Sequence, residues 1–123
     1  MSDLYGFDAF SPSEVVHRID AIGVVKARLP LRQMCLLALL AGAFIGLGGA
    51  MYLLVTADPS LPPSASRLLG GTVFALGLLL VVVAGAELFT GNNLLAMAWA
   101  GGRIGTAEVL RNWAIVCAGN LVG

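Results

Sequence analysis

Two long stretches without charge most constrain what this chain can fold into. Residues 33–57 contain no Asp, Glu, Lys or Arg, and residues 68–102 contain only Glu87. At about 1.5 Å per residue, a helix through the first stretch exceeds the roughly 30 Å hydrocarbon core of a bilayer. Only 11% of the 123 residues are charged and 59% are apolar, which is too little charge to cover a soluble domain. We therefore predict an all-α membrane protein with a first transmembrane helix at 33–57.

The second stretch is too long for one straight crossing, because a helix over residues 68–102 would measure about 53 Å. Its centre, residues 85–93, places two glycines, a threonine and two asparagines around Glu87, and these residue types favour loops over helix. We predict a broken second transmembrane helix over 68–100, interrupted by a loop at 85–93. Such backbone at membrane depth must be buried in protein or line a wet cavity.

The N-terminal region differs from the rest, because residues 1–32 hold eight of the fourteen charges. Ser11, Pro12 and Glu14 match a helix start with a capping box, and Pro30 is expected to end that helix. The region is predicted to form a cytosolic amphipathic helix that lies against the membrane face or a neighbouring subunit. His17 lies on this helix without a second histidine or a cysteine nearby, so we expect no metal site there.

Basic residues are unevenly distributed around the two stretches. Arg67 alone lies in the proline-rich connection at 58–67, whereas the basic residues before the first stretch and after the second are Arg18, Lys26, Arg28, Arg32, Arg103 and Arg111. The positive-inside rule therefore predicts a cytoplasmic N-terminus and a cytoplasmic loop at 101–111, with the 58–67 loop outside. Residues 112–123 are expected to begin a third transmembrane helix that is cut short, which leaves about two and a half spans.

Glu87 has two possible roles. An ionisable group inside a membrane segment is costly and often functional, so it is a candidate for direct proton or ion handling. A carboxylate beside a broken helix also accepts hydrogen bonds from freed backbone N–H groups, which supports the loop. Close to it, Thr90 offers a hydroxyl, and Gly91 and Asn92 offer backbone and amide groups at membrane depth.

Phe74 and Leu78 lie four residues apart on one face of the second helix. Apolar residues at that spacing are core residues by default. They are also candidates for a pore constriction, because their helix breaks toward the 85–93 loop. The sequence contains no nucleophile–base pair, phosphate-binding loop, metal-ligand spacing or excess of basic residues. We therefore expect no enzyme activity, no cofactor and no nucleic-acid partner.

Three motifs resemble the signatures of the formate/nitrite transporter family. Residues 41–48 resemble the signature of its first helix, and residues 85–92 resemble that of its second helix. Asn112-Trp113 together with residues 119–123 resembles the start of its third helix. All three occur in the family's order, and the second motif is the most specific.

This resemblance implies a homopentamer of six-helix, aquaporin-like protomers in the cell membrane, each with its own pore for a small monovalent anion such as formate, nitrite or hydrosulfide. Leu88, Phe89 and Thr90 match the pore-facing positions of the loop, Phe74 and Leu78 match residues of the apolar constrictions, and Glu87 matches an acid that steadies the loop. The family's second half, with its central pore histidine, has no counterpart in residues 1–123.

Two other interpretations remain open. The chain would be a non-transporting membrane anchor or an incomplete paralogue if nothing completed the pore. A small multidrug exporter is also a short chain with one membrane carboxylate. However, such exporters need four complete spans and carry their acid in the first helix, whereas Glu87 lies in the second.

Overall fold

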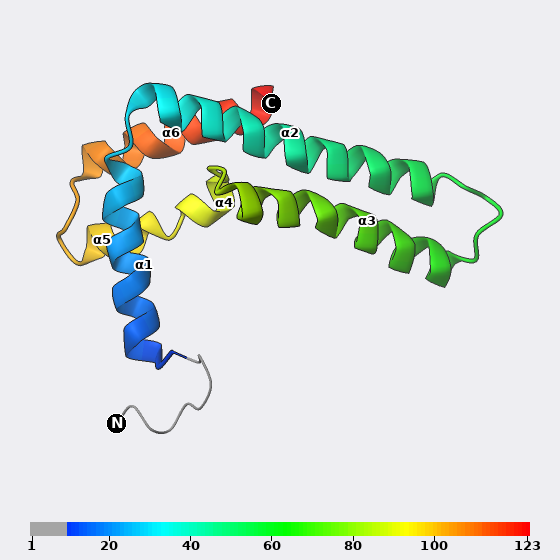
Figure 1. The fold of residues 1–123 in the computed structure, drawn as a ribbon, viewed down its shortest axis with the longest axis horizontal. Coiled ribbons are helices and arrows are strands. Elements are labelled where there is room, and N and C mark those ends of the chain that lie inside the picture. The colour runs from blue at the N-terminus through cyan, green and yellow to red at the C-terminus, as the bar shows by residue number, and fades with distance from the viewer. Residues whose placement is uncertain (1–9) are drawn as a thin grey trace.

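The computed structural model describes residues 10–123, and short connections join its helices (Figure 1). The predicted lead-in at 1–32 is therefore described only from residue 10 onward. The helices are α1 (Pro12–Ala27), α2 (Leu31–Thr56), α3 (Pro63–Ala84), α4 (Phe89–Asn92), α5 (Leu95–Ala100) and α6 (Thr106–Val122). No strand forms within the described part of the chain, so the all-α class is confirmed.

Helices α2 and α3 form a long antiparallel hairpin, and both are long and apolar enough to cross a membrane (Figure 1). They approach closely at two glycines. A Cβ on Gly77 would lie 2.7 Å from the carbonyl oxygen of Phe44, and one on Gly48 would lie 3.0 Å from that of Phe74. Small residues at such positions let membrane helices pack backbone against backbone. Close backbone contact at these two glycines therefore helps to hold the hairpin together.

Both hairpin helices begin earlier than expected. Helix α2 starts at Leu31 and α3 starts at Pro63, whereas the predicted spans start at residues 33 and 68. Each start follows a proline in extended conformation, Pro30 and Pro62. The first turns lie at the ends of the uncharged stretches, so they tolerate charged residues such as Arg32 and Arg67.

Helix α6 runs parallel to the first half of α2. Val116 of α6 is fully buried against Met34 and Ala38 of α2, and Gly119 lies directly over Ala38. Further along, Asn120 passes over Gly42. Parallel packing means that α6 starts at the same end of the molecule as α2.

The start of α6 requires a correction. A loop was predicted at 101–111 and a helix from 112, but α6 begins at Thr106. The side chain of Glu108 accepts a hydrogen bond from the Gly105 N–H (2.7 Å), and Arg28 pairs with its other oxygen (3.1 Å). Charged residues in this region therefore begin the helix instead of marking a loop.

Helix α1 lies across the start of α2 (Figure 1). It contacts α5 of its own chain through Gly23 and Ala27, both buried, and a Cβ on Gly23 would lie 3.1 Å from that of Ala98. The apolar residues Val15 and Ile22 of the same helix are exposed. Small residues made this side the contact face because they allow the two helices to come close.

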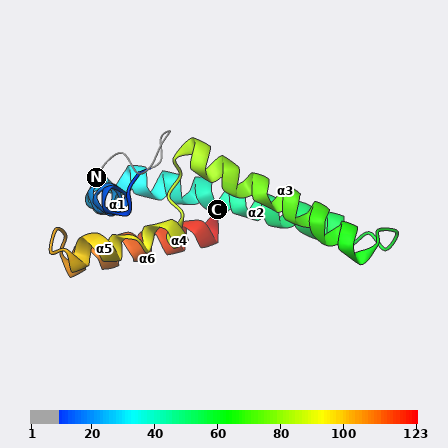
Figure 2. The same ribbon diagram turned by 90° about the horizontal axis from the view of Figure 1, so that it is seen from below.

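Two ion pairs tie α1 and its C-cap to the connection after α5 and to the first turn of α6. Arg103 pairs with Asp20, and Arg28 pairs with Glu108. Figure 2 shows α5 and α6 in one layer, with α1 and the start of α2 in the layer above. Helix α1 and residues 101–105 therefore lie at one end of the molecule, called the inner end below. The connection between α2 and α3 lies at the other end.

Candidate functional site

The second helix is broken by a short non-helical segment, residues 85–88, called the break segment below. Helix α3 ends at Gly85, whose φ of 62° is in the left-handed region that glycine adopts without strain. The chain then runs extended to Leu88, and residues 89–92 form the single turn α4. The break is thus shorter than the predicted loop at 85–93, because its second half recovers helical hydrogen bonds.

Glu87 lies at the centre of the break segment and is only 3% exposed. Its Oε1 accepts a hydrogen bond from Lys26 Nζ (2.8 Å), and its Oε2 accepts one from Asn92 Nδ2 (2.7 Å). Its backbone N–H donates to the carbonyl of Leu37 on α2 (3.2 Å). The carboxylate therefore joins α1, the break segment and α4, since a buried charge needs a partner and hydrogen bonds.

The hydrogen bonds continue from Glu87 to α6. Lys26 Nζ also donates to Asn92 Oδ1 (3.0 Å), and Asn92 Nδ2 donates to Asn112 Oδ1 (2.9 Å). The amide of Asn112 donates in turn to the Lys26 carbonyl (3.1 Å). Lys26, Glu87, Asn92 and Asn112 form one polar network, and the side chains of both asparagines are fully buried.

Asn120 holds the backbone of the break segment against α2. Its Nδ2 donates to the carbonyls of Ala38 (2.8 Å) and Glu87 (2.9 Å), and its Oδ1 accepts the N–H of Phe89 (2.8 Å). Trp113 adds a second clamp, because its Nε1 donates to the Asn92 carbonyl (3.0 Å). These side chains satisfy backbone groups that the helix break leaves without partners.

A hollow of about 560 Å³ opens beside the break segment. Its walls are mostly apolar, and Lys26, Glu87 and Thr90 supply its polar side chains. The lining residues are Ile22, Lys26, Leu78, Val81, Val82, Gly85, Ala86, Glu87, Leu88, Thr90 and Gly91. The Lys26 ammonium has three N–H donors, of which two are used by the network. The hollow thus combines apolar walls with the Lys26–Glu87 ion pair and a hydroxyl.

Four of the predicted path residues line this hollow together: Leu78, Leu88, Thr90 and Gly91. Phe74 does not, because it lies further out on α3 beside a separate hollow with Tyr52 and Gly71. Of the two predicted constriction residues, only Leu78 therefore lines the hollow beside the break segment.

Two predicted path residues point elsewhere. The Phe89 ring packs edge to face on Trp113 of α6, with ring centroids 6.4 Å apart. The Asn92 side chain is fully buried in the polar network. Both residues hold α4 against α6 in the described structure, since α4 is one helical turn whose side chains face in different directions.

Three residues of this site were not singled out as site residues from the sequence. In the sequence, Lys26 is notable only as one of the basic residues that predict the membrane topology. Asn112 and Asn120 are notable only as parts of the third-helix motif. A signal was present for the asparagines, because two amides in an apolar run are costly unless they find hydrogen-bond partners. No comparable signal marks Lys26, whose partner lies 61 residues away in sequence.

Comparisons with known proteins identify the family of this chain. The family model described as "Formate/nitrite transporter" matches residues 13–123. An uncharacterized transporter of Bacillus subtilis, YrhG, is 43% identical over 114 residues, which cover 91% of this chain and 43% of the relative. The formate channel FocA of Escherichia coli is 38% identical over 118 residues, which cover 95% of this chain and 41% of the relative.

A probable formate transporter of Methanothermobacter thermautotrophicus is 38% identical over 117 residues, covering 92% of this chain and 43% of that protein. The chain thus spans less than half the length of these curated relatives. The match nevertheless includes α1, the break segment and the polar network. This chain belongs to the formate/nitrite transporter family.

Proposed function

We propose that this protein moves small monovalent anions, formate or nitrite among them, across a cell membrane through a path in each protomer. The observation that carries the proposal is the hollow beside the break segment, which is lined by Leu78, Leu88 and Thr90 together with Lys26. The printed names of the relatives, which include formate channels and a formate transporter, support the choice of substrate class.

The chemistry of the hollow suits a small anion. Apolar walls exclude large hydrated solutes, and they also make the transfer of a bare anion costly. The Thr90 hydroxyl offers a hydrogen bond, and the Lys26 ammonium offers a third N–H donor that neither Glu87 nor Asn92 occupies. Both groups lower the cost of dehydrating an anion near the break segment.

The complete assembly belongs to the same proposal. A six-helix, aquaporin-like protomer in a homopentamer would place a path like this in every subunit. A cytoplasmic N-terminus would put the inner end, with α1 and residues 101–105, in the cytosol. The closed network around Glu87 favours loop support over direct proton handling, because both of its oxygens already accept hydrogen bonds.

Flux measurements test the path. The full-length protein is reconstituted into liposomes and the uptake of radiolabelled formate is measured for Thr90→Val. The change removes a hydrogen bond to a charged solute, so we expect flux to fall by about tenfold or more. Thr72→Val is the matched control, because Thr72 bonds only to Leu68 of its own helix. Unchanged flux in Thr90→Val, or an equal loss in the control, would contradict the proposed path.

A further inference from the structure

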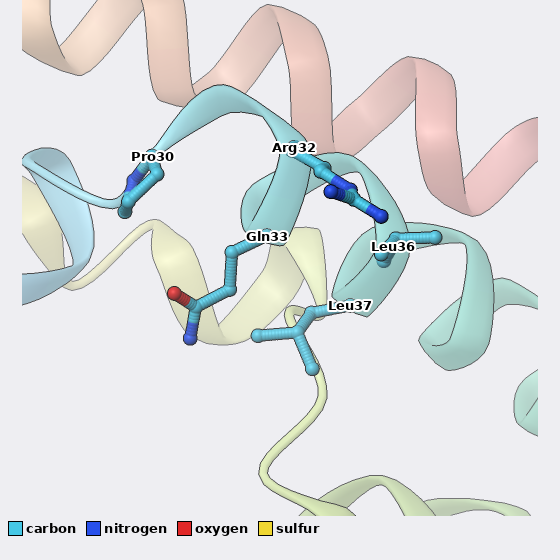
Figure 3. A pocket seen from close by; sticks show the side chains of 5 residues that line it. All are labelled: Pro30, Arg32, Gln33, Leu36 and Leu37. Carbon is cyan, nitrogen blue, oxygen red and sulfur yellow. The ribbon is translucent and has the colours of Figure 1, made fainter.

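A second hollow lies outside the transport site, at the corner where α1 meets α2. It has a volume of about 440 Å³ and is open to the surroundings. Five residues line it, as Figure 3 shows: Pro30, Arg32, Gln33, Leu36 and Leu37. Its walls are mainly apolar, and Arg32 and Gln33 provide the polar groups. None of these residues lines the hollow beside the break segment.

The charge at this corner is positive. Arg32 is exposed and forms no ion pair among residues 10–123. Arg111 also reaches the corner, where it donates to the carbonyls of Ala27 (3.5 Å) and Leu29 (3.4 Å). The acids Asp20, Glu87 and Glu108 are each paired with another basic residue. A ligand at this corner must therefore bring its own negative charge.

The depth of the corner limits the ligand further. Arg32 is the last charged residue before the uncharged stretch 33–57, so it stands where α2 leaves the lipid headgroups. Leu36 lies one turn further into the apolar stretch, and it is 58% exposed. In Figure 3 the Arg32 and Leu36 side chains lie next to each other on one side of α2. A molecule that carries both an anionic group and an acyl chain could thus place the anionic group on Arg32 and the acyl chain on Leu36.

We propose that this corner binds an anionic phospholipid. The Arg32 guanidinium holds the phosphate, Gln33 offers an amide N–H to the headgroup, and Leu36 and Leu37 contact the first part of an acyl chain. Arginine binds phosphate through paired N–H groups, and basic residues at the edge of a span attract anionic lipid. A small free anion would use only the polar part of this surface.

Lipid retention tests the proposal. The purified full-length protein is incubated with phosphatidylglycerol or phosphatidylcholine, and bound lipid is counted by native mass spectrometry. We expect Arg32→Gln to retain about fivefold less phosphatidylglycerol, the effect of removing one basic residue at a membrane surface. Phosphatidylcholine retention should stay low in both proteins. Equal phosphatidylglycerol retention in the wild type and the variant would overturn the proposal.

Arg67→Gln is the matched control. Arg67 is an exposed arginine near the start of the other hairpin helix, α3, at the opposite end of the molecule. The Arg67→Gln variant should retain as much phosphatidylglycerol as the wild type. If Arg67→Gln lost as much lipid as Arg32→Gln, the retention would reflect general charge attraction rather than a site, and the proposal would be wrong.

A labelling experiment asks whether the hollow is open to lipid. Leu36→Cys is made in a background with Cys35→Ser and Cys117→Ser and is treated with a lipid-soluble maleimide in bilayers. We expect labelling in phosphatidylcholine and slower labelling when phosphatidylglycerol is added. A cysteine that stays unlabelled in both bilayers would show that another protein segment or a second copy covers the hollow, which excludes the lipid.

Discussion

The inner and outer parts of the bundle are held together by different means. In the inner part, which comprises α1, the break segment, α4–α6 and the start of α2, three ion pairs and a buried polar network join the elements. In the outer part, residues 44–83, the helices meet at glycines, and the threonines Thr56 and Thr72 bond only to their own helices. Among residues 10–123, polar side chains join different elements only in the part that contains the broken helix.

The reason for this contrast lies in the backbone. An intact helix satisfies its own N–H and C=O groups, so α2 and α3 need only close packing. The break segment frees backbone groups, and side chains from α6 and a carbonyl of α2 bind them. The predictions below therefore expect larger effects in the inner part than in the outer part.

Removal of the buried acid should have the largest effect. Glu87→Ala removes the negative charge that neutralises the part-buried Lys26 ammonium, and it removes one hydrogen bond from the Asn92 amide. The free energy of unfolding should therefore fall by about 3 kcal/mol. Unfolding of the purified protein in mixed detergent micelles measures this. Glu87→Gln, which keeps an acceptor but loses the charge, should lose less. If Glu87→Ala were as stable as the wild type, the polar network would not hold the inner part together, and the contrast with the outer part would be wrong.

Loss of the backbone clamp should come next. Asn120→Ala leaves the N–H of Phe89 and the carbonyls of Ala38 and Glu87 without their hydrogen bonds, at a cost of about 1–3 kcal/mol. Asn93→Ala is the control, because Asn93 is an exposed asparagine whose loss should change stability by less than about 0.5 kcal/mol. The same unfolding measurement compares them, and equal effects would show that Asn120 is no clamp.

The outer part is tested with two glycines of α3. Gly77→Ala brings a methyl group against the Phe44 carbonyl, and overpacking of this kind costs about 1–3 kcal/mol. The clash is with a backbone oxygen, so the two helices must move apart locally to accommodate the methyl group. Gly71→Ala is the control, since a Cβ there meets nothing within 4 Å. If both variants unfolded alike, the close approach at Gly77 would not hold the hairpin.

The smallest effect concerns pH at the start of α6. The Gly105 N–H, and then the Arg28 guanidinium, hold the pKa of Glu108 below its ordinary value. Because the pKa of Glu108 is lowered in the folded state, its hydrogen bond and ion pair stabilise the start of α6 at pH values above the ordinary pKa of Glu. This stabilisation is lost as the pH falls through the lowered pKa. Hydrogen exchange at Gly105, corrected for the intrinsic rate, should therefore lose protection in acid. Glu108→Gln should show no such pH step, and a step that persisted in it would contradict this assignment.

Much of the outer part follows from the sequence pattern. The uncharged stretches predicted the helical hairpin because burial of an apolar helix in lipid depends on length and composition. The break near Glu87 was also predictable, since glycine, threonine and asparagine around an acid favour a loop. The start of α6 was not predictable, because charged residues such as Glu108 and Arg111 are typical of a loop. In the structure Glu108 bonds to Gly105 and Arg28, and Arg111 donates to the carbonyls of Ala27 and Leu29.

The sequence by itself determined that this chain has apolar helices of membrane length, an interruption at Glu87 and a family signature around it, because these depend on local composition and order. Only the tertiary structure decided what holds the interruption in place. Lys26 and Asn120 become partners of the break segment through contacts between residues far apart in sequence. The direction of Phe89 and the burial of Asn92 depend on where α6 packs, which no local pattern specifies.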